Sequence, residues 1–241
     1  MAFKDVLDAA SAGDPHAQNA IGYIYFRGDG VPQDYEKAVV WFDLSAEQGD
    51  PEGQCNLGYM IAHGYGANVN PGRAFELYRL SAEQGYARAQ FNLGHAYSDG
   101  MGVEQDWDKA YGWYSKAAEN GIMVAYYRMG VINEEGRGRP KDEKLAAEIF
   151  DKCSKDGYDK AGYRLARMYL DGRGVRKDAG RAFKLMFSAA DGGNVDAMFG
   201  LGMMFLSGDG AVKSRDNAVK WLKKAASRGS HKATEALSEL I

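Results

Sequence analysis

Side chains capable of catalysis or metal binding are few in this chain of 241 residues, and they lie far apart. Metal centres and catalytic triads need such groups at short, defined spacings, as in H-E-x-x-H or paired C-x-x-C motifs. Neither motif occurs, nor does a P-loop or a G-x-S-x-G elbow. We therefore expect no catalytic residue, no metal ligand and no cofactor. The four histidines stand singly at His16, His63, His95 and His231.

The two cysteines and the glycine-rich turns do not change this expectation. Cys55 and Cys153 lie 98 residues apart, so we expect two small packing residues in a reducing compartment rather than a disulfide. Gly-Asp-Gly occurs at 28–30 and 208–210, but the 12-residue ligand ladder of a calcium loop is missing. We therefore expect the function to depend on a binding surface and on the helices that form it.

Those elements recur with a period of 36 residues. A fixed period of this length is typical of a solenoid, in which each unit buries its apolar face on its neighbours. Two glycines recur in every block, at the positions of Gly28 and Gly30 in the first. Six blocks begin at Ala17, Gly53, Ala89, Ala125, Ala161 and Ala197.

Each block is predicted to form two helices joined by a turn. In the first block, apolar residues at helical spacing precede Gly28, which permits the left-handed backbone of a helix exit. Asp34 is placed to cap a second helix, in which Trp41 is expected to fill the gap between hairpins. Glycine recurs inside the first helix at the position of Gly22, which indicates close approach by the backbone of a partner helix.

The blocks resemble the Sel1-like repeat, a relative of the tetratricopeptide repeat. The second and fourth blocks depart from the pattern, for example at Ile61 and Arg139, so the turn of the fourth block is open to change. The third block carries the resemblance best, through Ala89, Leu93, Gly94, Tyr97, Gly100, Gly102, Val103, Asp106, Lys109, Ala110, Trp113, Ala117, Ala118 and Gly121.

The pattern and the resemblance together predict an all-α protein, a right-handed α-solenoid of about 14 helices in a single domain over residues 1–241. A lone second helix is expected at the N-terminus and a lone first helix at the C-terminus, where they shield the last core faces. The expected segments are a half-repeat at 3–16, repeats at 17–52, 53–88, 89–124, 125–160, 161–196 and 197–232, and a terminal helix at 233–241.

Charge and hydropathy narrow the class of partner. The pI is near 5.9 and no basic stripe interleaved with aromatic residues runs along the chain, which argues against nucleic acid. No apolar stretch reaches membrane-spanning length, and Met1 is followed by no secretory signal, so we expect a cytoplasmic protein unless a leader has been removed. Residues 1–120 hold 8 basic and 17 acidic side chains, whereas residues 121–241 hold 22 and 16.

Similarity to tetratricopeptide arrays implies that the first helices line a concave surface. Variable positions on these helices carry aromatic, asparagine and arginine side chains, which are typical of binding surfaces. The resemblance implies that Asn56 and Asn92 hydrogen-bond a peptide backbone, and arginines would suit an acidic segment. The predicted partner-binding residues are Tyr23, Asn56, Tyr59, Phe91, Asn92, His95, Tyr127, Arg128, Tyr163, Arg164, Arg167 and Phe199.

The sequence therefore favours a non-catalytic scaffold that binds a peptide or partner protein along the concave face. Two alternatives stay open. One is a hydrolase of the kind proposed for cysteine-rich Sel1-like proteins that act on β-lactams, although this chain lacks their cysteine pair in each repeat. The other is a structural solenoid that self-associates weakly through its acidic and basic ends.

Overall fold

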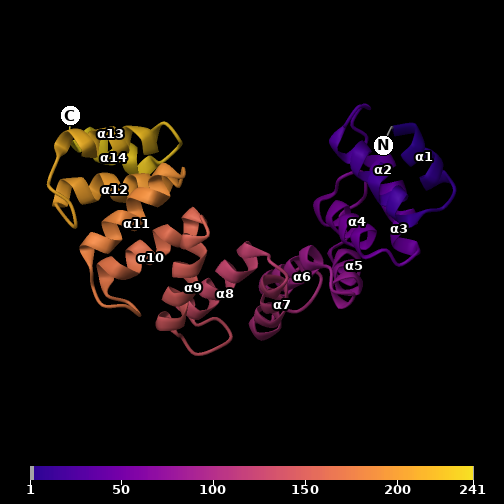
Figure 1. Cartoon of the computed structure of the whole chain (residues 1–241), viewed down its shortest axis with the longest axis horizontal. Coiled ribbons are helices and arrows are strands. Elements are labelled where there is room, and N and C mark those ends of the chain that lie inside the picture. The colour runs from indigo at the N-terminus through magenta and orange to yellow at the C-terminus, as the bar shows by residue number, and fades with distance from the viewer. Residues whose placement is uncertain (1–2, 241) are drawn as a thin grey trace. The chain divides into compact units, whose positions relative to one another are not determined.

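The protein is all-α in the computed structural model, which describes residues 3–240. Met1, Ala2 and Ile241, which belong to the predicted chain ends, lie outside the described residues. The chain divides into two compact units, residues 1–125 and 126–241. Helices pack in chain order within each unit, as Figure 1 shows, and the predicted helical solenoid of hairpins is confirmed.

Unit 1 holds the first seven helices, and α8 (Met123–Glu135) begins at its end. Each first helix packs between two second helices, and α2 also contacts α4 directly. The helices of unit 1 are α1 (Phe3–Ser11), α2 (Pro15–Arg27), α3 (Tyr35–Glu47), α4 (Pro51–His63), α5 (Pro71–Glu83), α6 (Ala87–Asp99) and α7 (Trp107–Glu119).

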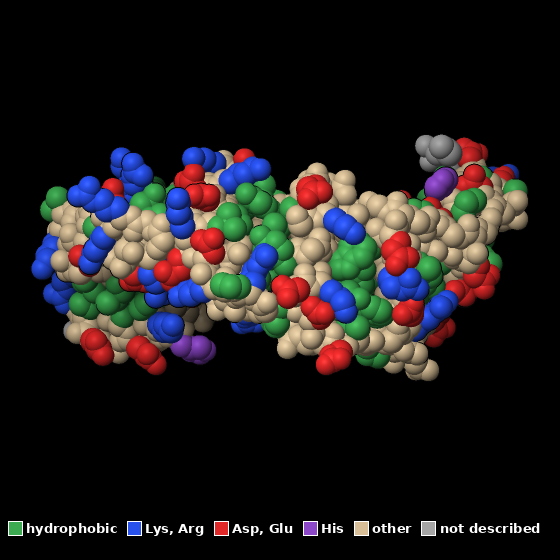
Figure 2. Space-filling model, turned by 90° about the horizontal axis from the view of Figure 1, so that it is seen from below, with side chains coloured by type: hydrophobic (Ala, Val, Ile, Leu, Met, Phe, Trp, Pro, Cys, Tyr) green, Lys and Arg blue, Asp and Glu red, His purple; other side chains and the backbone are tan. Residues whose placement is uncertain are grey.

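Unit 2 repeats this arrangement. Here α10 packs against α9 and α11, and α12 packs against α11 and α13. The further helices of unit 2 are α9 (Glu143–Lys155), α10 (Asp159–Asp171), α11 (Ala179–Asp191), α12 (Val195–Ser207), α13 (Arg215–Ala226) and α14 (His231–Leu240). On the face drawn in Figure 2, Lys and Arg side chains are prominent over unit 2.

Local chemistry sets the ends of these helices. The Asp34 carboxylate accepts a hydrogen bond from the backbone N–H of Lys37 at 2.9 Å, which satisfies an otherwise unpaired donor and confirms the predicted cap. Gly28 ends α2 in the left-handed region, with φ 76°, and its N–H reaches the Ile24 carbonyl. In the fourth block, Gly136 and Gly138 adopt the same left-handed conformation, so the turn there is retained.

In four turns the second glycine also touches the preceding hairpin. A methyl group placed on Gly102 would lie 2.1 Å from the carbonyl oxygen of Pro71, at the start of α5. Gly66, Gly174 and Gly210 meet the preceding hairpin in the same way. The turn thus packs one repeat onto the next, and only a residue without a side chain fits.

The core between hairpin helices is filled by a residue next to the predicted tryptophan. Phe42 is fully buried against Gly22 of the same hairpin, whereas Trp41, which was predicted to fill the gap between hairpins, is half-buried. Rings in this place also explain the internal glycines. A methyl group on Gly94 would lie 2.8 Å from the Tyr114 ring and 3.2 Å from the Ala110 carbonyl. The nearest group to the internal glycine is therefore a side chain of the partner helix, and the predicted backbone contact is the second nearest.

Candidate functional site

The predicted partner-binding residues all belong to first helices, but the structure brings only some of them together. In unit 1 they lie on α2, α4 and α6, and in unit 2 on α8, α10 and α12. Because the two units are separate bodies, each set is described by itself.

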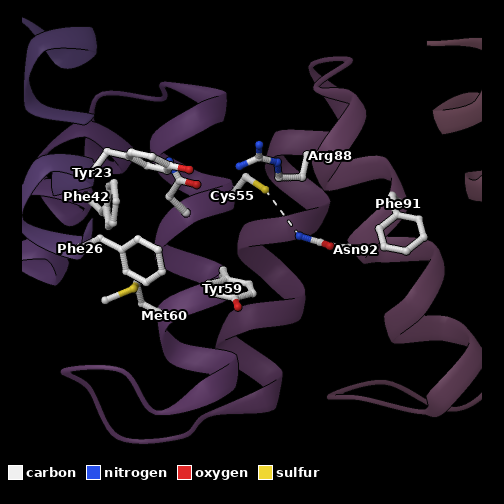
Figure 3. A pocket seen from close by; sticks show the side chains of 10 residues that line it. Tyr23, Phe26, Phe42, Cys55, Tyr59, Met60, Arg88, Phe91 and Asn92 are labelled. Carbon is white, nitrogen blue, oxygen red and sulfur yellow. Dashed lines mark hydrogen bonds between the residues drawn. The ribbon is translucent and has the colours of Figure 1, made fainter. Parts of the chain in front are cut away.

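Unit 1 contains a hollow of about 360 Å³ on its first helices. Helix α2 contributes Tyr23 and Phe26, and α3 contributes Phe42. Figure 3 shows these rings on one side of the hollow and Phe91 of α6 on the other. Five predicted residues line it together, namely Tyr23, Asn56, Tyr59, Phe91 and Asn92, whereas His95 does not.

Five of the ten residues that line the hollow are aromatic. The rings of Phe26 and Tyr59 meet edge to face with centroids 6.3 Å apart, and Tyr59 keeps 39% of its surface exposed. Edge-to-face pairs of this kind are favourable and rigid. The hollow is thus an apolar, preformed site with few polar groups, which is the usual make-up of a binding pocket.

The two asparagines in the hollow have partners within the protein. Asn56 is 8% exposed, and its Nδ2 donates to Oδ1 of Asn19 at 2.8 Å. Asn92 is half-buried, and its Nδ2 approaches Sγ of Cys55 at 3.6 Å, a weak hydrogen bond because sulfur is a poor acceptor. Of the two, Asn92 has the amide that is freer to meet a ligand.

Sequence reasoning missed several residues that line the hollow: Phe26, Phe42, Cys55, Met60 and Arg88. Arg88 was missed because it comes before the first residue of its block, outside the variable helix positions from which the partner-binding residues were predicted. A signal was present at Cys55, which stands where later blocks carry a ring.

The thiol in the hollow does not support nucleophilic chemistry. Burial raises the pKa of Cys55 to about 12, and nearby Arg88 and Asn92 lower it only in part. The thiolate is the nucleophilic form of cysteine, so at neutral pH this side chain is inert. No group of three or more His, Cys, Asp or Glu suited to a metal ion occurs within residues 3–240.

In unit 2 one predicted ligand-binding arginine is held inside the protein. Arg164 pairs with Glu134, which is 7% exposed, and its Nε donates to the Tyr127 hydroxyl at 3.0 Å. Arg173 donates to the same carboxylate at 2.9 Å. Burial alone would lower the pKa of Arg164, but Tyr127 and Glu134 raise it above its ordinary value. The structure therefore gives Arg164 an internal partner in place of an acidic ligand.

The other predicted residues of unit 2 surround this network without forming a described hollow. The Tyr127 ring packs on Phe150 with centroids 5.6 Å apart, so it completes the hairpin core. Tyr163 and Phe199 are half-buried against the core of α10–α13. Arg128 and Arg167 are exposed, and Arg167 donates weakly to the Tyr163 hydroxyl at 3.4 Å.

Comparison with known families decides the identity of the repeat. The Sel1 repeat matches six times, at residues 15–50, 51–86, 87–122, 124–158, 160–194 and 195–230. The chain belongs to the Sel1 repeat family. This confirms the resemblance seen in the sequence, and the Sel1 hairpins are those that supply α2 to α13.

Solved Sel1 structures agree with this assignment. A Sel1 repeat protein from Oxalobacter formigenes is 34% identical, with a TM-score of 0.82 over 90% of this chain and 86% of that one. The protein c5321, a protective antigen of uropathogenic Escherichia coli with an SLR fold, is 30% identical with a TM-score of 0.80. The present chain is covered completely but spans 59% of c5321.

More distant similarity extends to the fold alone. The immunity protein Pa5087 from Pseudomonas aeruginosa is 23% identical, with a TM-score of 0.50 over 76% of this chain and 67% of that one. No curated protein matches the chain. No helix within residues 3–240 is both long and apolar enough to cross a membrane.

Proposed function

We propose that this Sel1 repeat protein is a non-catalytic scaffold that binds a peptide segment of a partner protein on the first-helix face of unit 1. The hollow lined by α2, α4 and α6 carries this proposal, because rings from three successive repeats converge on one apolar site. A site of this kind is suited to the side chain of an extended segment.

The polar groups of the hollow support a peptide rather than an apolar small molecule. Arg88 and Asn92 lie on α6 beside the rings, as Figure 3 shows, and both side chains donate hydrogen bonds. A peptide backbone offers a carbonyl acceptor at every residue. Ring anchors combined with a few donors therefore match an extended chain.

The charge of unit 1 bears on the class of partner. Its residues 1–125 hold 17 acidic and 8 basic side chains. A phosphate backbone would be repelled by this excess, since affinity for nucleic acid depends on cationic contacts. We keep the proposal of a protein partner, with no cofactor and a cytoplasmic location.

Selection of peptides on the purified full chain tests the proposal. A displayed random-peptide library should enrich sequences whose affinity falls at least tenfold with Tyr59→Ala or Phe91→Ala, because each change removes part of the ring wall. Leu80→Ala is the matched control, since Leu80 on α5 is also 39% exposed and lies outside the hollow. Failure to enrich any peptide, or equal binding to Tyr59→Ala, contradicts the proposal.

Weak self-association is a second candidate function. It is favoured because the acidic and the basic halves of the chain correspond to the two compact units. The acidic excess ends where unit 1 ends, and residues 126–241 carry 22 basic and 16 acidic side chains. Unit 1 of one copy can thus attract unit 2 of another. Sedimentation should then show mass that rises with concentration and falls with added salt. A constant monomer mass removes this candidate. No described feature favours the hydrolase alternative.

A further inference from the structure

The third residue of each repeat, here named the ring position, varies in a way that explains the hollow. The last four repeats place an aromatic side chain there. In two of them the ring packs on the second helix of the same hairpin: Phe91 lies 5.7 Å from Tyr114, and Tyr127 lies 5.6 Å from Phe150, between ring centroids. The ring position is therefore built to hold a ring. Its occupants are Asn19, Cys55, Phe91, Tyr127, Tyr163 and Phe199.

The first two repeats lack this ring, and the hollow lies among them. Asn19 donates no side chain to the hollow, because its amide is bonded to Asn56, and the buried Phe42 of the same hairpin lines the hollow instead. In the next repeat Cys55 supplies only a thiol. The volume of about 360 Å³ is ample, since a cavity of ~150 Å³ accommodates benzene. At Cys55, therefore, the hollow adjoins a ring position that carries no ring.

One cationic side chain lines the hollow. Arg88 is the one charged residue among the described residues that line the hollow. Its side chain makes no ion pair with any residue between 3 and 240. The positive charge of Arg88 acts on the Cys55 thiol, because Arg88 is the main group that lowers the pKa of this buried side chain. Figure 3 draws its guanidinium beside Cys55 and Asn92.

Resting on the proposed function, we propose that the hollow binds an aromatic side chain of the partner segment, with a carboxylate next to that ring paired with Arg88. The partner ring stacks among Tyr59, Phe26 and Phe91, in the role that the ring position fills by itself in later repeats. Arg88 then binds the carboxylate through charge-assisted hydrogen bonds. A longer acidic run is disfavoured, because unit 1 holds 17 acidic side chains against 8 basic ones.

The methyl group of Met60 offers a local readout, because Met60 lines the hollow. The full chain is labelled with ¹³C-methyl methionine, and 3-phenylpropionate serves as the probe, with the Met60 signal assigned through Met60→Leu. We expect the probe to shift the Met60 signal through its ring current, with saturation in the millimolar range expected of a fragment. The signals of Met168 and Met198, buried in unit 2, should stay in place.

Two further probes separate the contribution of the ring from that of the charge. Butyrate carries the carboxylate without the ring, and we expect it to bind at least tenfold more weakly than 3-phenylpropionate. The uncharged 3-phenylpropanamide should bind about threefold to tenfold more weakly, because it lacks the charge that Arg88 attracts. Arg88→Gln should remove this difference by weakening the carboxylate alone.

Filling the hollow from inside provides the matched pair of variants. Cys55→Phe restores a ring at the ring position and should abolish the Met60 shift, while Cys55→Ala leaves the space open and should preserve it. Helical circular dichroism monitors folding of both. If Cys55→Phe does not fold, the comparison of butyrate with 3-phenylpropionate on the unaltered chain still decides the matter.

Three results overturn this inference: no Met60 shift with 3-phenylpropionate, equal binding of butyrate, or an unchanged shift in folded Cys55→Phe. Library peptides that depend on Tyr59 but carry no aromatic anchor also overturn it, while the scaffold proposal stands. Loss of Tyr59 dependence overturns the scaffold proposal, whatever the fragments do.

Discussion

Asn56 donates a hydrogen bond from Nδ2 to Oδ1 of Asn19, 37 residues earlier in the chain, at 2.8 Å. The same offset joins Asn92 to Cys55 and Arg164 to Tyr127. The fourth residue of one repeat thus binds the ring position of the repeat before it. This ladder ties neighbouring repeats together within each unit, so the polar groups predicted to hold a peptide also hold the stack.

Replacement of Asn56 tests the structural side of this ladder. Asn56→Ala leaves the buried Asn19 amide without its partner, and the free energy of unfolding should fall by about 1–3 kcal/mol. Asn92→Ala removes only a weak bond to sulfur and should lower it by less than about 1 kcal/mol. Urea unfolding followed by circular dichroism measures both.

A double-mutant cycle with Asn19→Ala completes this test. The coupling free energy between Asn19 and Asn56 should be about 1 kcal/mol, because each side chain is the other's partner. Additive effects of the two changes would show that the bond contributes no stability.

The ion pairs of Glu134 with Arg164 and Arg173 are predicted to stabilise unit 2. Glu134→Gln removes the buried carboxylate that Arg164 and Arg173 share and leaves them only more exposed acidic partners, so the free energy of unfolding should fall by about 2–4 kcal/mol. Asp151→Asn on α9 is the control, since its pair with Lys155 is solvent-exposed and should be worth less than about 1 kcal/mol. Equal effects of the two changes in urea unfolding would contradict the role given to Glu134.

Substitutions at two turn glycines distinguish the cost of backbone strain from the cost of disturbing the contact between repeats. Gly30 and Gly102 have nearly the same φ, 77° and 73°. A methyl group on Gly30 meets no atom within 4 Å, but on Gly102 it would lie 2.1 Å from the Pro71 carbonyl oxygen. Gly30→Ala should cost about 1–2 kcal/mol from left-handed strain. Gly102→Ala should cost about 1–3 kcal/mol more.

Thermal and urea unfolding of these two variants measure the difference. Since φ is matched, a larger effect of Gly102→Ala reports the contact between repeats. If Gly30→Ala destabilises the protein as much as Gly102→Ala, the turn does not stabilise the stack through that contact.

Stability should fall at alkaline pH. Burial raises the pKa of Cys55 to about 12 and that of Tyr86 to about 12, and it also raises the pKa of Tyr78. The unfolded chain loses these protons near their ordinary values of about 8.5 and 10, so it binds fewer protons than the folded chain above those values. The free energy of unfolding is therefore unaffected by these groups below about pH 8 and declines as pH rises toward 12.

Two measurements check this behaviour. Urea unfolding between pH 7 and 10.5 should show the decline, and Cys55→Ala should reduce its slope between about pH 8.5 and 10. Iodoacetamide at pH 7.5 should label neither Cys55 nor Cys153 in the folded protein, since burial raises both pKa values, to about 12 and about 11. Rapid native labelling of Cys55 would contradict its neutral, buried state.

The constant residues of the period were sufficient to predict the hairpin. Asp34 and Gly28 act on backbone groups within a few residues of themselves, so their effect is readable from sequence. The full burial of Phe42 could not be read from the period, because Trp41 and Phe42 are both large and adjacent, and the exact rotation of α3 decides which one is buried more fully. Arg164 was read as a ligand-binding group because its partner, Glu134, lies 30 residues away on another helix.

The sequence by itself determined that this chain is a stack of Sel1 hairpins, because a strict period imposes the same local backbone chemistry on every block. It also placed Tyr23, Tyr59 and Phe91 on one set of helices. Only the tertiary structure decided which of these rings share a hollow, and that Arg88 joins them. That outcome depends on which side chains neighbouring repeats direct at each other, and on the small side chain of Cys55 at a position where later repeats carry a ring.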